Sequence, residues 1–408
     1  MLTRRVTFRL YPSKTQTAWL FGWRKLHQLL YNSAVADCKD SYQRLGQSVD
    51  YFGQQNALPA FKQVWPEYNV LGSHALQATL KRVDFAFQRF FKGLGKYPRF
   101  KSIRHFSGWT YPDRAGWKAH TVGDNGTLEL SKLESIKMRG KARQWGTPTT
   151  CTILYRHKCW YASITINCEL VRETGDGAVG VDLGCLSAVA TSEGQLIENP
   201  RYLGKTLAKV KQVSRDKRRK RAPSFKKRIK ASSQWRKAQK RVSKLTRKIS
   251  SQRQDWAHKV AAQIVSCNSL VATEKLNLRN MTRKARGQGK RQKAGLNRSI
   301  LDVGMGYLRS CLEYKLTEAN GVFIEVPTQQ VKPSQTCPQC GRQEKKTLEQ
   351  RVHSCPCGCI ENRDVAAAQV MLNWALGMSV FKRGETSSIS CGSMRQLGSK
   401  KRQKLAPL

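Results

Sequence analysis

Residues 178–184 read Ala-Val-Gly-Val-Asp-Leu-Gly, an apolar strand that carries a single carboxylate. An aspartate within such a run is costly to bury unless its side chain binds something. Residues 187–191 and 195–198 continue as a hairpin around the turn Ser192-Glu193-Gly194. This stretch predicts the first strands of a sheet in which Asp182 is a functional acid.

The segments that follow predict further strands and helices of the same unit. Helical periodicity runs over 201–260, with a break near Ala222-Pro223, and then over 257–270, 299–319 and 364–376, while short apolar strands are predicted at 269–274 and 322–326. The order hairpin, helices, strand, helix, strand, helix is typical of an RNase H-like α/β sheet. Glu274 ends one of these strands, and Asp364 begins the last helix.

In such a sheet, carboxylates on adjacent strands and on a facing helix converge. Asp182, Glu274 and Asp364 are therefore the candidate catalytic acids. Two-metal phosphodiester hydrolysis requires a cluster of carboxylates to neutralise the cations, and Mg²⁺ prefers oxygen ligands. Taken singly, each acid has a structural alternative as a salt-bridge partner or, for Asp364, as a helix N-cap.

Five of the 13 cysteines cluster between residues 337 and 359, which is the arrangement that metal binding requires. The pair Cys337-x-x-Cys340 and a second pair beginning at Cys355 predict a tetrahedral zinc ribbon over 334–359. The other eight cysteines have no regular spacing and are interpreted as small buried hydrophobic residues of a reducing compartment: Cys38, Cys151, Cys159, Cys168, Cys185, Cys267, Cys311 and Cys391.

The N-terminal half has a different pattern. Residues 3–10 alternate as a strand, residues 13–46, 53–64 and 73–91 are helical, and short strands recur over 99–175. The sequence thus predicts a multidomain α/β protein with a β-barrel domain of residues 1–10 and 99–175 and a helical domain of residues 11–98 inserted into it. An RNase H-like nuclease domain of residues 176–333 and 360–378, the zinc ribbon of residues 334–359 and a basic disordered tail of residues 379–408 complete it.

The formal net charge of +47 requires a polyanionic partner, and nucleic acid is the natural one. Residues 201–260 hold 23 lysines and arginines against two acids, and a basic, glycine-containing loop is predicted at 279–298. These segments are expected to line a phosphate-binding channel. Among the interleaved aromatics Tyr202, Phe225, Trp235 and Trp256, which could stack on bases, Trp256 is better interpreted as a core anchor.

The sequence contains no apolar run approaching the roughly 18 residues of a membrane span, so no membrane partner is expected. The N-terminus lacks the apolar stretch of a signal peptide. A cytoplasmic protein is predicted.

Several motifs together resemble the TnpB family, the transposon-encoded relatives of type V CRISPR effectors. The most specific are Gly180-Val181-Asp182-Leu183-Gly184, residues 272–276, the segment Ser334-Gln335-Thr336-Cys337 and the run Asn362-Arg363-Asp364-Val365-Ala366-Ala367-Ala368. Phe8-Arg9-Leu10-Tyr11-Pro12, residues 75–80 and Phe90-Phe91 extend the resemblance into the N-terminal half. The resemblance reaches from the N-terminus to about residue 376. It implies that the β-barrel is the family's wedge domain, that the inserted helices are its recognition domain and that the RNase H-like domain is a RuvC-like nuclease. It also implies a protein that acts at the prokaryotic nucleoid.

The resemblance implies an RNA-guided DNA endonuclease of an insertion sequence. Such a protein binds a guide RNA derived from the transposon end and cuts double-stranded DNA beside a short target-adjacent motif. It implies two catalytic Mg²⁺ ions at Asp182, Glu274 and Asp364, and one structural Zn²⁺. It also places Tyr51 and Gln77 where the family contacts the target-adjacent motif. A monomer for each RNA is expected.

Two departures from the family pattern stand out. Family members often have asparagine two and six residues after the last aspartate, where this chain has Ala366 and Val370. The second cysteine pair, usually C-x-x-C, is shortened to Cys355-Pro356-Cys357. Cys357 keeps the family's seven-residue distance to Asp364, so the predicted zinc ligands are Cys337, Cys340, Cys355 and Cys357, with Cys359 as an alternative ligand.

Three rival functions stay open on the sequence alone. A nuclease-inactive RNA-guided repressor is disfavoured by the intact set of three acids. A transposase that moves its own element fits the ribbon before the last acid less well. A zinc-ribbon RNA-binding protein without catalysis would lack metal-dependent DNA cutting.

Overall fold

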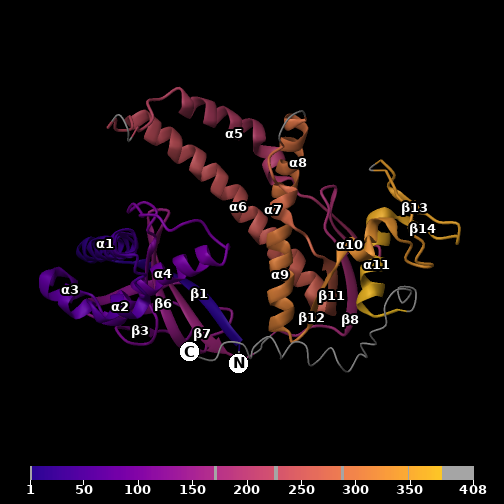
Figure 1. The fold of residues 1–408 in the computed structure, drawn as a ribbon. Coiled ribbons are helices and arrows are strands. Elements are labelled where there is room, and N and C mark those ends of the chain that lie inside the picture. The colour runs from indigo at the N-terminus through magenta and orange to yellow at the C-terminus, as the bar shows by residue number, and fades with distance from the viewer. Residues whose placement is uncertain (1, 170–171, 225–227, 286–288, 348, 379–408) are drawn as a thin grey trace. The chain divides into compact units, whose positions relative to one another are not determined.

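The computed structural model describes residues 2–169, 172–224, 228–285, 289–347 and 349–378 (Figure 1). The predicted tail, 379–408, lies outside these residues, as does Phe225. The chain divides into two compact units, Met1–Val171 and Arg172–Leu408. Each unit has its own hydrophobic core, which is expected for a chain longer than about 250–300 residues.

The first unit contains a seven-stranded antiparallel sheet with the strand order β2-β6-β7-β1-β5-β4-β3. Its strands are β1 (Leu2–Tyr11), β2 (Gly108–Tyr111), β3 (Trp117–His120), β4 (Gly126–Leu130), β5 (Leu133–Arg139), β6 (Thr147–Arg156) and β7 (Cys159–Cys168). The N-terminal strand pairs with both β5 and β7, as the sequence predicts. The sequence interpretation missed β3, which has only four residues. Closure of this sheet into a barrel stays a prediction.

The helices of the first unit are α1 (Lys14–Leu45), α2 (Tyr51–Asn56), α3 (Leu58–Val64) and α4 (Ser73–Phe91). A capping box at Ser13 and Gln16 starts α1, and Gly46 ends it with φ 67°. The single helix predicted over 53–64 is wrong: it is two helices that meet at Ala57. Pro59 lies in the first turn of α3, where a residue without an N–H can begin a helix but could not continue one.

The second unit contains a five-stranded sheet with the order β10-β9-β8-β11-β12 (Figure 1). Its strands are β8 (Gly177–Asp182), β9 (Ser187–Thr191), β10 (Leu196–Glu198), β11 (Asn268–Glu274) and β12 (Val322–Val326). The first three strands are antiparallel, whereas β11 runs parallel to both β8 and β12. Strand β8 is therefore central, and its carboxyl end lies at the same edge as that of β11.

The helices of this unit are α5 (Tyr202–Arg218), α6 (Ser233–Cys267), α7 (Leu278–Met281), α8 (Lys290–Val303), α9 (Met305–Glu318), α10 (Thr328–Val331) and α11 (Arg363–Ala375). Two sequence expectations are corrected. The range 279–298 is not simply a loop, because α8 begins at Lys290. The helix predicted over 299–319 is broken at Gly304, whose left-handed backbone, with φ 74°, ends α8 before α9 begins.

The sheet is covered on both faces by helices. Val179, Val181 and Val271 belong to a core cluster with α6 and α9. Ala272 belongs to another cluster with α11. Because successive strand residues point to opposite faces, Gly180 and Ala272 share the face that α11 covers.

A short hairpin of β13 (Val352–Ser354) and β14 (Ile360–Asn362) precedes α11 directly. No described helix is long and apolar enough to cross a membrane.

Candidate nuclease site and metal centre

Asp182 and Glu274 end two neighbouring parallel strands at the same edge of the sheet. In the register, Ala272 lies opposite Gly180 and Thr273 opposite Val181, so the next residues, Glu274 and Asp182, are neighbours. Asp182 lies two residues after Gly180, and Glu274 lies two residues after Ala272. Because alternate strand residues share a face of the sheet, both acids belong to the face that α11 covers.

Asp364 is brought to this face by close packing of α11 on β8. A Cβ atom on Gly180 would lie 1.8 Å from the backbone oxygen of Ala368, so only glycine allows this approach. Asp364 lies one helical turn before Ala368, in the first turn of α11. Asn362 caps that helix, and its side-chain oxygen accepts from the Asp364 amide at 2.9 Å.

The electrostatics of Asp182 show that the three acids share one region. Burial raises the pKa of Asp182 to about 8, and the negative charges of Glu274 and Asp364 add to the rise. Burial also raises the pKa of Glu274. Carboxylates in such surroundings repel one another when ionised, and a bound cation removes that repulsion.

The donor set fits a hard divalent cation, because it consists of carboxylate oxygens. Among the described residues, the groups whose ligand atoms all lie within 4.8 Å of one another are two sets that contain Cys337, and the three acids are not among them. At least two of the three acids therefore have ligand atoms more than 4.8 Å apart.

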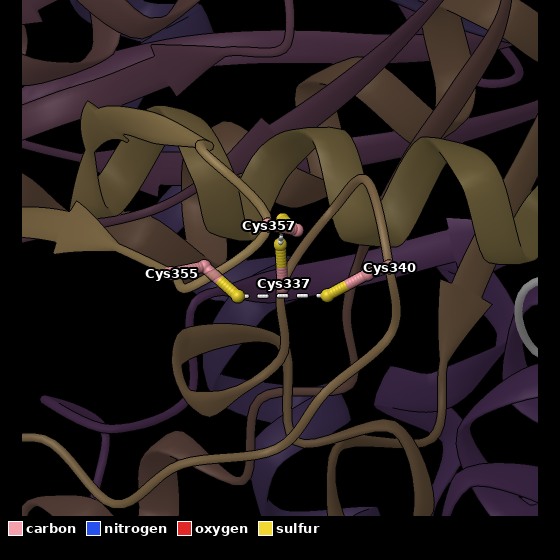
Figure 2. Close-up of side chains that lie close together, drawn as sticks. All are labelled: Cys337, Cys340, Cys355 and Cys357. Carbon is pink, nitrogen blue, oxygen red and sulfur yellow. Dashed lines mark hydrogen bonds between the residues drawn. The ribbon is translucent and has the colours of Figure 1, made fainter.

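The predicted zinc ligands Cys337, Cys340, Cys355 and Cys357 come together, and Figure 2 shows their side chains pointing toward one another. The Sγ atoms of Cys337 and Cys357 are 3.6 Å apart, and those of Cys340 and Cys355 are 3.5 Å apart. Four thiolates at about 2.3 Å from a tetrahedral Zn²⁺ would be separated by about 3.8 Å. The four cysteines therefore fit zinc nearly without rearrangement.

Local backbone turns explain why the shortened second pair can still join this cluster. Gly358, with φ 89°, donates to the Cys355 carbonyl at 2.9 Å. The Cys355 amide donates to the Cys359 carbonyl at 3.0 Å. This tight turn directs the Cys355 and Cys357 side chains to the same side as Cys337.

The cysteine cluster is tied to the helix that carries Asp364. The side chain of Asn373 on α11 donates to the Pro338 carbonyl at 2.9 Å, and β14 runs directly into α11. The ribbon thus anchors both ends of the segment that places the last acid.

Sequence analysis missed His353, which is buried on β13 and has a ring nitrogen in the second cysteine group, with Cys337 and Cys359. No pattern in the sequence marks this residue, because it is a single histidine in a polar segment.

Tyr51 and Gln77 lie on neighbouring helices of the first unit. Tyr51 starts α2, and the Nζ atom of Lys81 lies 5.5 Å from its ring centre. Gln77 is one turn before Lys81 on α4 and is partly exposed. Both residues are partly exposed.

Helices α5 and α6 form a long basic pair (Figure 1). No residue of α5 is buried. Asp302 on α8 clamps the base of the pair: it accepts from the Leu203 and Gly204 amides at 3.0 and 3.2 Å, and forms an ion pair with Arg253 of α6 at 2.6 Å. Trp256 packs against the core, as the sequence interpretation favoured.

Two family models match this chain. The model described as "Probable transposase" (OrfB_IS605) matches residues 163–285, and the one described as "Cas12f1-like, TNB domain" matches residues 306–371. The "Putative RNA-guided DNA endonuclease" of Streptomyces pristinaespiralis is 28% identical and covers 96% of each chain. The "Putative RNA-guided DNA endonuclease InsQ" of Escherichia coli (strain K12) is 27% identical over 96% of this chain and 94% of its own.

Solved structures with detectable similarity include a Cas12f1-sgRNA-target DNA complex, with TM-score 0.32 and 14% identity over 92% of this chain and 100% of that chain. The mini-RNA-guided endonuclease CRISPR-Cas_phi3 has TM-score 0.44 and 10% identity over 95% of this chain and 93% of its own.

The mixed sheet carries Asp182 and Glu274 at two neighbouring strand ends, and the helix that covers this face carries Asp364. Together with the near-full-length similarity of the chain to these relatives, this defines a multidomain α/β nuclease that acts on DNA. Within that class, the two family models and the two relatives support a TnpB family protein.

Proposed function

We propose that this chain is an RNA-guided DNA endonuclease of an insertion sequence, which cleaves double-stranded DNA beside a short target-adjacent motif. The observation that carries the proposal is the convergence of Asp182, Glu274 and Asp364, from two strand ends and a covering helix, on one partly buried acidic region. The near-full-length similarity to the two putative RNA-guided DNA endonucleases supports the same function.

Asp182, Glu274 and Asp364 are the residues that would hold two Mg²⁺ ions in an RNase H-like site. When bound, Mg²⁺ supplies charge neutralisation at the scissile phosphate and activation of water. The chain's own contribution is to orient the three carboxylates. The β8–β11 pairing fixes Asp182 beside Glu274, and the Gly180–Ala368 approach fixes Asp364 above them.

The basic pair α5–α6, together with α8, would bind the phosphates of the guide RNA and of its heteroduplex with the target. Recognition of this kind reads backbone and shape, whereas base pairing reads sequence. The exposure of α5 supports this role, because none of its lysine and arginine side chains is buried.

The remaining parts complete the proposal. One Zn²⁺ at Cys337, Cys340, Cys355 and Cys357 would be structural, holding α11 through the ribbon. Tyr51 and Gln77 would contact the target-adjacent motif, within a helical recognition domain inserted in a β-barrel wedge domain. One chain is proposed to enclose one RNA.

The function is tested by expressing the full chain with its native flanking DNA and sequencing the RNA that copurifies. The complex is then incubated with Mg²⁺ and a plasmid library that carries the guide-matched target beside randomised sequence. We expect one defined RNA, and cleavage confined to plasmids that share a short adjacent motif.

Two variants serve as controls for this experiment. Asp182→Asn should abolish cleavage while RNA still copurifies, whereas Asp216→Asn, an amide replacement of an exposed acid on α5, should cut normally. Guided binding without cleavage by the unaltered protein would instead indicate the nuclease-inactive repressor. Absence of a defined RNA would contradict the guided function and favour the transposase.

A further inference from the structure

The ribbon contains more metal-binding side chains than one zinc ion can use. A structural zinc takes four ligands. We call Cys337, Cys340, Cys355 and Cys357 the outer set, because Cys340 and Cys357 are exposed. A second group, Cys337, His353 and Cys359, also has all its ligand atoms within 4.8 Å of one another.

His353 gives the strongest indication that the second group can bind a metal. The residue is 2% exposed, and its Nε2 atom has no hydrogen-bond partner. Leaving a buried polar nitrogen unpaired is energetically unfavourable. Its other ring nitrogen, Nδ1, contacts the Lys346 amine. Nε2 can therefore bind a metal only in the tautomer that carries the ring proton on Nδ1.

Cys355 is outside this second group, because its Sγ atom is not within 4.8 Å of all three other ligand atoms. It packs with Cys337 and Cys359 in a buried cluster, however, so a movement of its side chain would complete the group to four ligands. With His353 they form what we call the inner set, in which every side chain is buried. The inner and outer sets share Cys337 and Cys355, and they differ by exchanging the exposed Cys340 and Cys357 for the buried His353 and Cys359.

We propose that the inner set is an alternative zinc site, to which the ion passes when Cys340 and Cys357 cannot bind it. In this exchange, the bonds from zinc to the Sγ atoms of Cys340 and Cys357 break, and bonds to Cys359 Sγ and His353 Nε2 form. The two released thiolates take up two protons, and the Cys359 thiol gives up one, so one proton is taken up overall. No electron is transferred.

Lys346 selects between the two sets. When its ammonium donates to Nδ1, the ring proton of neutral His353 must sit on Nε2, which then cannot bind zinc. Binding through Nε2 places the proton on Nδ1, where an acceptor is needed. Lys346→Gln provides an amide oxygen there, and should shift zinc toward the inner set.

The first test uses the zinc-loaded full chain and the thiol reagent iodoacetamide. Modified cysteines are mapped by mass spectrometry, and released zinc is followed with a colorimetric chelator. We expect Cys340 and Cys357 to be alkylated while one zinc per chain stays bound. Release of zinc in proportion to alkylation of these two cysteines would overturn the proposal.

The second test uses Co²⁺ absorption, which reports the number of thiolate ligands. The double variant Cys340→Ser/Cys357→Ser should bind one Co²⁺ with three thiolates and one imidazole. Adding His353→Ala should then weaken Co²⁺ binding by more than the ~10–100-fold that loss of a supporting hydrogen bond costs. Adding His120→Ala instead, which removes an imidazole of the first unit, should leave Co²⁺ binding unchanged.

Loss of Co²⁺ binding in the double variant would contradict the inner set, as would binding that is insensitive to His353. In either case His353 would only support the Cys337 thiolate. Neither test uses guide RNA or DNA cleavage, so the proposal stands or fails separately from the nuclease function.

Discussion

Gly180 determines how closely α11 approaches the sheet, and hence where Asp364 lies. In Gly180→Ala, the new Cβ would meet the Ala368 backbone oxygen at 1.8 Å, so the helix must move away. A displacement of about 1 Å at a reacting centre can cost ~10²-fold in rate. We expect DNA cleavage to fall about 100-fold with little change in RNA affinity, measured by single-turnover cleavage and filter binding.

Gly295→Ala is the matched control, because a Cβ there meets nothing within 4 Å on α8. Unchanged cleavage by Gly180→Ala would mean that the contact between β8 and α11 does not position the acid.

His27 makes the stability of the first unit depend on pH. Burial lowers the pKa of His27 to about 3, and the charge of Arg82 acts in the same direction. Nδ1 contacts the Thr79 hydroxyl at 2.8 Å, and the hydroxyl itself donates to the Ala75 carbonyl, so Nδ1 carries the proton. Protonation would add an unpaired buried charge at Nε2.

The unfolded chain, with an ordinary histidine pKa near 6.5, binds this proton more readily than the folded one. The stability is therefore fully present above about pH 6.5 and is lost as the pH falls toward 3. We expect the urea midpoint of the first unit to fall less between pH 7.5 and 5 in His27→Gln than in the unaltered chain. Equal falls would contradict the neutral, buried His27.

Individual site residues differed in how visible they were in the sequence. Asp182 and Glu274 could be predicted because an acid at the end of an apolar strand is unusual, and Asp364 because it starts a helix beside clustered cysteines. His353 could not, because one histidine in a polar segment has no distinguishing pattern. Only the folded hairpin shows that its ring is buried beside Cys337 and Cys359.

Asp302 couples three helices at the base of the basic pair. It caps the start of α5 and pairs with Arg253, whose side chain remains 25% exposed. Removing one partner of a buried pair costs about 3–5 kcal/mol, and the lower end applies here because Arg253 can be hydrated. We expect Asp302→Ala to destabilise this unit by roughly 3 kcal/mol and to make α5 sensitive to limited proteolysis.

The exposed pair of Asp255 and Lys259 on α6 provides the control. Its side chains are 64% and 75% exposed, so Asp255→Ala should have little effect on stability. Equal effects of the two substitutions would show that Asp302 is not a clamp.

Whole helices could be predicted from the sequence where the apolar periodicity was long. The prediction failed where the backbone of a single residue ended one helix and allowed another to begin. The limits of α1 were predicted closely, because Ser13 and Gly46 are clear caps. The split between α2 and α3, and the break at Gly304, depend on local backbone geometry that apolar periodicity does not encode.

Across the molecule, the charge of +47 should make RNA binding strongly dependent on salt. Each phosphate contact contributes about 0.7–0.9 to the slope of log affinity against log salt concentration. Replacing the exposed Arg215, Arg218 and Arg219 by glutamine should reduce the slope by about 2, measured by RNA titration at several salt concentrations.

Lys259→Gln is the control for this series, because the Lys259 amine is already engaged by Asp255. A slope unaffected by the triple replacement would indicate that α5 does not contact the RNA.

The central question for the molecule is whether the three acids form one catalytic site. The most direct measurement is single-turnover cleavage of a guide-matched duplex in Mg²⁺ by the unaltered complex and by Asp182→Asn, Glu274→Gln and Asp364→Asn. DNA binding is measured in parallel. Each variant should lose more than about 100-fold in cleavage rate and still bind the target, because each removes a charge that the transition state requires. Near-normal cleavage by any one of them would contradict a site built from these three acids.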